Sequence, residues 1–159
     1  MKKVLLHTCC APCSVSCIRQ LRAEGIEPVS YWYNPNIHPY MEYKARRDTL
    51  MAYAPSVGVE LVVQEDYGLR DFCRAVAADI DHRCGKCYAM RLEQTARYAA
   101  ENGFESFTTT LLVSPYQNHE LLAETARRMA EDCGCVFSEE ERYANKLEKD
   151  RREPLKHIL

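Results

Sequence analysis

Two groups of cysteines stand where the sequence changes from one pattern to another. Cys9 and Cys10 are adjacent at the end of the first apolar run, and Cys13 follows shortly after them. Cys84 and Cys87 are separated by two residues at the start of a helical pattern. Thiolates that converge from two such places bind a soft metal ion or an iron–sulfur cluster. This spacing therefore indicates a metal-dependent or redox protein.

The number of thiolates does not by itself identify the metal. Four thiolates from two loops hold either Zn²⁺ or a [4Fe–4S] cluster. Structural zinc usually supports a small fold that lacks a core, so it is the weaker alternative for this chain. Cys10 and Cys13 also form a Cys-x-Pro-Cys sequence typical of thiol–disulfide oxidoreductases. The thioredoxin fold places that motif after a strand–helix unit, however, and here it follows the first strand.

Other cysteines lie outside these two groups. Cys133 and Cys135 flank one glycine, and such a pair can close a small, strained disulfide ring that is easily reduced. The pair could store two electrons, supply further metal ligands or simply belong to a turn. Cys17 and Cys73 occupy apolar positions of helical patterns, which predicts buried thiols with a packing role.

The composition predicts a single folded domain over residues 1–159. The chain is 47% hydrophobic and 28% charged, with a formal charge of −2, so nucleic acid could bind only through a local basic patch. No apolar run reaches membrane-spanning length and no signal peptide is recognisable, which predicts a cytoplasmic protein without a membrane partner. Structural disulfides are rare in that compartment, so nine cysteines favour metal binding or catalysis.

Strand and helix patterns alternate along the chain, which predicts an α/β fold with a parallel sheet and helices on both faces. The expected strands are 4–7, 28–33, 59–64 and 104–112, and the expected helices are 12–25, 41–54, 69–78, 86–101 and 119–131, the first of them stopping at Gly25. Residues 139–159 form a charged tail, predicted to be a solvated helix. Such sheets bind ligands beyond the carboxyl ends of their strands, where residues 7–10, 34–39, 65–67 and 114–118 would gather.

Five motifs resemble those of one protein family. They are His7-Thr8-Cys9-Cys10-Ala11-Pro12-Cys13, Tyr33-Asn34-Pro35-Asn36-Ile37-His38-Pro39, Arg83-Cys84-x-x-Cys87 with Arg91-Leu92, Thr108-Thr109-Thr110-Leu111 with Ser114-Pro115, and Cys133-Gly134-Cys135 with Phe137-Ser138. In this order they resemble the epoxyqueuosine reductases of the QueH type. These enzymes act without cobalamin and reduce epoxyqueuosine to queuosine at the wobble position of tRNA.

The resemblance implies a Rossmann-like, HUP-type three-layer fold and a definite set of site residues. It implies a [4Fe–4S] cluster on Cys9, Cys10, Cys84 and Cys87, and a redox-active disulfide between Cys133 and Cys135. It also implies an additional iron ion, for which Asp66 and Cys13 are candidate ligands, and a tRNA substrate; the electron donor is not identified. A further strand and a long loop would be expected before Cys133, where this chain has neither.

The remaining candidates concern protons and RNA. Tyr33, His38 and Asp66 are candidate proton donors, and Asn34, Asn36 and Tyr116 are candidates for recognising the modified base. Candidate phosphate contacts are Lys44, Arg46, Arg47, Arg83, Lys86 and Arg91, although solvated helix faces are an equal alternative. A thiol oxidoreductase and a zinc-stabilised binding module remain alternatives. A tRNA sulfur transferase does not fit, because the phosphate-binding loop it requires after the first strand is replaced here by cysteines.

Overall fold

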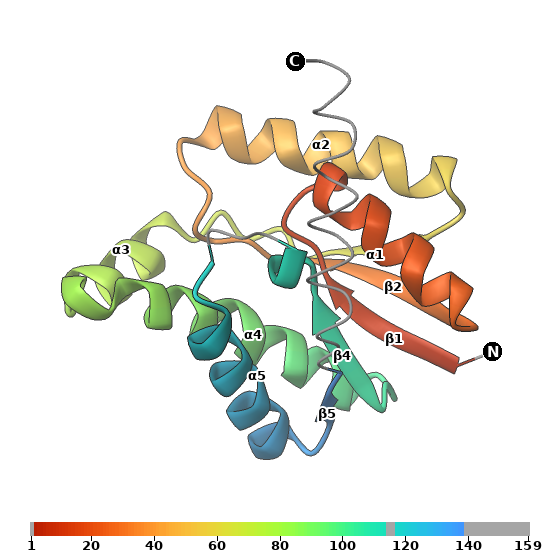
Figure 1. Cartoon of the computed structure of the whole chain (residues 1–159). Helices are drawn as coiled ribbons and strands as arrows, with labels where there is room; N and C mark the ends of the chain where they lie inside the picture. The colour runs from red at the N-terminus through yellow and green to blue at the C-terminus, as the bar shows by residue number, and fades with distance from the viewer. Residues whose placement is uncertain (1, 114–116, 139–159) are drawn as a thin grey trace, which may run out of the picture.

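Five parallel strands form one sheet in the computed structural model, which describes residues 2–113 and 117–138. The strands are β1 (Lys2–His7), β2 (Ile26–Trp32), β3 (Glu60–Val63), β4 (Ser106–Thr109) and β5 (Val136–Phe137). Their order in the sheet is β3-β2-β1-β4-β5, so the direction in which strands are added reverses between β1 and β4 (Figure 1).

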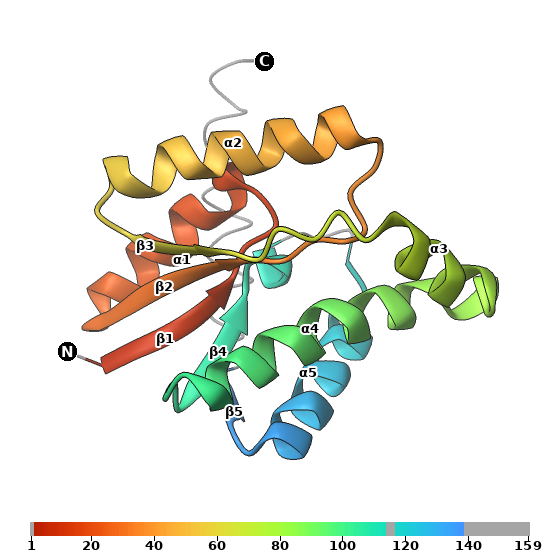
Figure 2. The ribbon, with the colours of Figure 1, turned by 180° about the vertical axis from the view of Figure 1, so that it is seen from behind.

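Helices cover both faces of this sheet. They are α1 (Ala11–Ala23), α2 (Tyr40–Ser56), α3 (Leu69–Ala77), α4 (Arg83–Glu101) and α5 (His119–Cys133), with short 3₁₀ turns η1 (Ile80–His82) and η2 (Thr110–Val113). Helices α1 and α2 pack together on one face, and α4 and α5 on the other (Figures 1 and 2). The predicted three-layer, Rossmann-like α/β fold is confirmed.

The sheet is apolar on both faces because helices cover both faces of its central strands. In β1, Leu5 belongs to the core under α4 and α5, whereas Val4 and Leu6 belong to the core under α1. In β2, Tyr31 stacks on Tyr98 of α4 with ring centroids 4.7 Å apart. The side chains of successive strand residues thus alternate between two cores.

Several helices and strands begin or end at other residues than predicted, and the differences change which elements contain the cysteines. Helix α4 begins at Arg83 rather than at residue 86, so Cys84 and Cys87 both lie in its first turns. Helix α5 continues to Cys133, and an unpredicted strand, β5, follows immediately. Two apolar residues that form β5 are too few to show an alternating pattern. The prediction that Cys73 is buried is wrong, because α3 contributes no buried residue, whereas Cys17 is buried as predicted.

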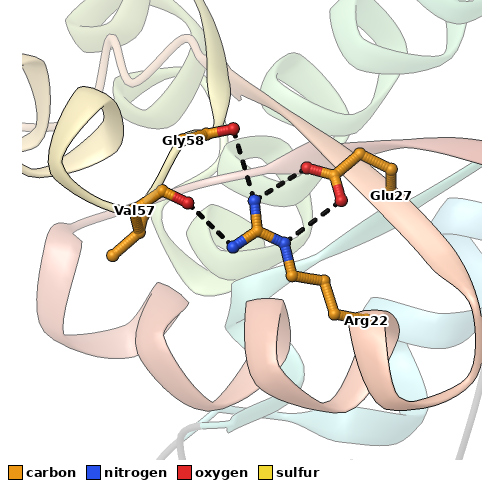
Figure 3. Close-up of polar contacts among 4 residues, drawn as sticks. All are labelled: Arg22, Glu27, Val57 and Gly58. Carbon is orange, nitrogen blue, oxygen red and sulfur yellow. Dashed lines mark hydrogen bonds and ion pairs between the residues drawn. The ribbon is translucent and has the colours of Figure 1, made fainter.

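One guanidinium group joins three segments at the amino edge of the sheet. Arg22, near the end of α1, donates from Nε and Nη2 to the Glu27 carboxylate at 3.1 and 2.8 Å (Figure 3). It also donates to the carbonyl oxygens of Val57 and Gly58 in the turn between α2 and β3. The guanidinium donates to backbone carbonyls and to a carboxylate at once, which fixes the turns at the edge opposite Cys9 and Cys10.

The loops that follow β2 and β3 touch each other at the carboxyl edge. Gly68 has φ +58°, and a Cβ added to it would lie 2.9 Å from the Cβ of Pro35. A larger residue would therefore be strained by its backbone conformation and would also push the two loops apart. Gly103 has a similar φ of +77°, but nothing lies within 4 Å of its hypothetical Cβ.

We predict that Gly68→Ala destabilises the protein more than Gly103→Ala. Both substitutions impose the left-handed conformation on alanine at a cost of about 1–2 kcal/mol, and only the first adds a steric clash. Urea unfolding of the two variants measures the difference. Equal losses of unfolding free energy would contradict the close approach of the two loops.

Some sequence predictions concern residues outside the described ranges. Ser114, Pro115 and Tyr116 are among them, as is the predicted charged tail 139–159. Within the described part of the chain, no helix is long and apolar enough to cross a membrane.

Candidate metal and redox centre

The point where the strand order reverses lies between β1 and β4. In the parallel ladder Leu6 is opposite Thr108 and His7 is opposite Thr109, so both strands end at the same level. The chain then continues into α1 on one face of the sheet and, after β4, into η2 and α5. Diverging connections of this kind leave a crevice beyond the strand ends, which is the usual ligand position in such folds.

Three cysteines line this position. The Sγ atoms of Cys9, Cys10 and Cys13 all lie within 4.8 Å of one another. Cys10 is the extended N-cap residue of α1, and Cys13 lies in the first turn of that helix. The backbone N–H of Cys9 donates to Thr110 Oγ1 at 3.0 Å, and that hydroxyl lies 3.2 Å from Cys9 Sγ. Thr110, in the turn η2 that follows β4, therefore fixes both the backbone and the thiol of Cys9.

The three thiols form hydrogen bonds with one another, and these bonds give the thiols different pKa values. Hydrogen bonds from Cys13 and Cys9 hold the pKa of Cys10 far below its ordinary value, and the charge of Arg46 lowers it further. The pKa of Cys13 rises because it donates to Cys10, and the pKa of Cys9 is raised chiefly by its hydrogen bond to Cys10. Hydrogen bonding within the cluster therefore favours the thiolate at Cys10, which is the form that binds a soft cation.

His7 lies fully buried beneath the thiols. Its Nε2 lies 3.2 Å from the carbonyl oxygen of Tyr33, which can only accept, so we assign the proton to Nε2. Its Nδ1 then accepts from the Thr109 hydroxyl at 2.9 Å. Burial lowers the pKa of His7 to about 3, and the positive charge of Arg91 adds to the effect. His7 is therefore a neutral ring that ties β1 to both neighbouring strands.

The second pair of cysteines approaches the same edge through Arg91. Arg91 follows Cys87 by one helical turn on α4, and its Nη2 donates to Cys87 Sγ at 3.1 Å. The Arg91 side chain is only 5% exposed, and its charge acts on His7 at the end of β1. Cys87 is half-buried and Cys84 is exposed. The structure thus connects Cys87, through Arg91, to the base of the first cysteine group.

The gathered thiols form a donor set that could hold a soft metal ion or an iron–sulfur group. Within the described residues, the only group compact enough for a single ion is Cys9, Cys10 and Cys13, without Cys84 or Cys87. Thiolates around a cubane cluster radiate from four irons and stand further apart than those on one ion. Soft thiolates from two elements, together with a buried guanidinium whose Nε lacks a partner, suit a bulky anionic sulfur cofactor.

Cys133 and Cys135 lie at the opposite edge of the sheet. Val136 begins β5 and pairs with Ser106, the first residue of β4, so Cys135 precedes the amino ends of these strands. The length of β4 places this edge roughly 10 Å or more from the thiol group at its carboxyl end. Both thiols are free, and Cys135 donates to the carbonyl oxygen of Ala96 at 3.6 Å. Burial raises the pKa of both thiols, which keeps them protonated.

The other predicted residues divide between the crevice and the surface. Asn34 is buried and donates to the carbonyl oxygen of Thr8, next to the first cysteine pair. The pKa of Tyr33 is raised by burial and then by the charge of Asp66, so the phenol keeps its proton. Asn36 Oδ1 is buried without a partner, and His38 packs against Tyr67 and Phe72.

The predicted phosphate contacts are only partly supported. Lys44 and Arg46 are exposed but paired with Asp48 and Glu42 of their own helix. Arg47 is also paired with Asp48, whereas Arg83 and Lys86 are exposed at the start of α4. Arg91 is too deeply buried to contact a phosphate, so that prediction is wrong. Its spacing of four residues from Cys87 could have indicated an inward position on α4.

We predict that His7 makes the metal-free protein less stable in acid. Its folded pKa of about 3 lies below the unfolded value of 6.5, so the unfolded chain binds the proton first as the pH falls. Unfolding free energy should drop by up to about 1.4 kcal/mol per pH unit below the unfolded pKa. In urea unfolding, the stability deficit of His7→Asn should therefore shrink as the pH falls from about 8 to 5. A deficit that does not vary with pH would contradict a buried neutral ring.

The fold and site together define a Rossmann-like α/β protein whose ligand crevice is lined by cysteines. A family model described as "Epoxyqueuosine reductase QueH" matches residues 4–156. The chain belongs to this family, which confirms the resemblance seen in its motifs and the oxidoreductase class.

Curated relatives carry the same description. The chain is 38% identical over 136 residues to the epoxyqueuosine reductase QueH of Dehalococcoides mccartyi, covering 86% of this chain and 75% of that protein. It is 38% identical over 134 residues to the protein of Histophilus somni and 32% identical over 145 residues to that of Thermotoga maritima. These matches cover 81% and 86% of this chain, and 55% and 73% of those proteins. The chain thus spans about half to three quarters of the relatives' lengths.

Proposed function

We propose that this protein reduces epoxyqueuosine to queuosine in the anticodon of tRNA. The observation that carries the proposal is the match to the family over residues 4–156, combined with the thiol groups gathered around one strand end. A tRNA substrate places the reaction in the cytoplasm. The electron donor is a further partner, for which the chain offers no distinguishing residue.

The reaction removes an epoxide oxygen and leaves an alkene. It consumes two electrons and two protons and releases water. We assign a [4Fe–4S] cluster to Cys9, Cys10, Cys84 and Cys87; when bound, it would supply electrons one at a time. We also assign an additional iron ion, with Asp66 and Cys13 as candidate ligands; Cys13 lies in the same thiol group as Cys9 and Cys10.

The chain itself must orient the base and deliver protons. Tyr33 follows β2 at the same edge as Cys9, and we assign its phenol as a proton donor on that position alone, since burial raises its pKa and makes it a weaker acid. Asn34 fixes the carbonyl oxygen of Thr8, and the unpartnered Oδ1 of Asn36 is free to accept a hydrogen bond from the modified base. His7 positions the end of β1 and, being neutral, adds no charge beneath the thiolates.

We assign Cys133 and Cys135 as the two-electron store that reloads the centre. Oxidation of this dithiol to a disulfide releases two electrons and two protons, which balances the epoxide reduction. Its position at the amino edge separates it from the substrate, so the pair acts as the entry point for electrons rather than as a group that touches the epoxide.

We predict that Cys87→Ser loses most of its iron and sulfide and lowers turnover of epoxyqueuosine tRNA by more than about tenfold, since even outer partners of a metal site often cost that much. The matched control is Cys73→Ser, which removes an exposed thiol from α3. Anaerobic purification with iron and sulfide analysis gives the comparison. Full iron content in Cys87→Ser would remove this cysteine from the ligand set.

We predict that Cys133→Ser keeps its iron but loses repeated turnover. Protein reduced beforehand with dithionite should still complete about one turnover, because the cluster and the additional iron ion can together hold the two electrons that it consumes and the substrate edge is intact. Cys73→Ser again controls for the loss of one thiol. Wild-type rates of repeated turnover in Cys133→Ser would contradict the assignment of the pair as an electron store.

A thiol–disulfide oxidoreductase is the second candidate, favoured by the depressed pKa of Cys10 beside Cys13. It would use these two sulfurs without metal. A colourless protein that contains no iron after anaerobic purification and still reduces disulfides would favour it over the reductase.

A further inference from the structure

A positive charge is buried beside Cys87. The Arg91 side chain is 5% exposed, and its Nε has no hydrogen-bond partner among the described residues. Among residues 2–113 and 117–138, no carboxylate forms an ion pair with it. Its Nη2 donates to the sulfur of Cys87, and its guanidinium carbon lies 6.0 Å from the centre of the Tyr88 ring.

This arrangement is unfavourable in the metal-free protein. A charged group removed from water is costly unless it meets an opposite charge and satisfies its hydrogen bonds. His7, on the other side, is neutral and has its own pKa lowered partly by Arg91. Neither neighbour compensates the charge, so the described site lacks the anion that a buried guanidinium requires.

We propose that Arg91 is the fixed counter-charge of the iron–sulfur group and sets its reduction potential. The inference rests on the proposed function, because the missing anion is the thiolate-bound cofactor itself. Arg91 donates to Cys87, one of its assigned ligands, and its charge acts on His7, two residues before Cys9. The guanidinium thus bonds one element that would hold the cofactor and acts electrostatically on the other, as a positioning residue rather than a catalytic one.

Electrostatics determines the sign of the effect. Reduction adds negative charge to the cofactor, and a cation held close to it where water is excluded stabilises the reduced form more than the oxidised form. Hydrogen bonds to the sulfurs and net charge are the terms by which a protein tunes such a cluster. Removing Arg91 should therefore make the cofactor harder to reduce.

The first experiment is an EPR-monitored redox titration of the reconstituted full chain. In Arg91→Gln, the ratio of reduced to oxidised cluster at the wild-type midpoint should fall about tenfold, which for one electron is a shift of about 59 mV to more negative potential. Arg91→Lys keeps the charge and should recover most of the shift. Arg97→Gln removes an exposed arginine paired with Glu93 on the same helix and should titrate like the wild type.

The second experiment uses the metal-free protein and separates charge from packing. Arg91→Met keeps an apolar stem of similar length and removes the buried charge, so it should melt at a higher temperature than metal-free wild type. The same variant should retain less iron and sulfide after reconstitution. A merely structural arginine would show the reverse in the metal-free protein, since its loss would lower the melting temperature.

The outcomes distinguish this inference from the function on which it rests. A wild type that contains no iron or sulfide overturns both. A wild type that carries the cluster, with an unchanged potential in Arg91→Gln, overturns the role of Arg91 and leaves the reductase intact. Arg91→Gln could also fail to load the cluster. Normal loading in Arg91→Lys would then support the counter-charge. Failure of both variants, together with a lower melting temperature of metal-free Arg91→Met, would overturn it.

Discussion

The pairing of β1 with β4 is the constraint on which the centre depends. These strands are far apart in the sequence, yet their parallel register sets His7 opposite Thr109 and brings Thr110 against Cys9. Thr109, the last residue of β4, contacts the buried ring, and Thr110, in the 3₁₀ turn that follows, contacts the thiol. A slip of the register by one residue would turn the side chains of His7 and Thr109 to opposite faces of the sheet. The cysteines therefore owe their position to a neighbouring strand as much as to their own.

The charges of three side chains are the second feature of the centre. Cys10 has a depressed pKa at the start of α1, Arg91 is buried without a carboxylate partner among the described residues, and His7 between them is neutral. The buried positive charge of Arg91 therefore requires an anion. A sulfur-rich anionic cofactor held by both cysteine groups would supply that negative charge, and this is the physical reason for assigning the two groups to one site.

The sequence predicted the architecture better than the geometry of the site. Alternating apolar patterns identified four of the strands and all five α-helices. The short β5 was missed because two residues carry no periodicity. Without β5, the position of Cys133 and Cys135 at the amino edge of the sheet could not be predicted. The burial of Arg91 was also missed, because a basic residue beside cysteines resembles a surface contact until the packing of α4 is known.

An iron-edge anomalous diffraction experiment on crystals of the loaded protein tests the central claim most directly. The account predicts strong iron density beyond the carboxyl ends of β1 and β4, bonded to sulfur from both Cys9–Cys10 and Cys84–Cys87. Iron bonded only within the group of Cys9, Cys10 and Cys13, with the sulfurs of α4 left unbound, would contradict it.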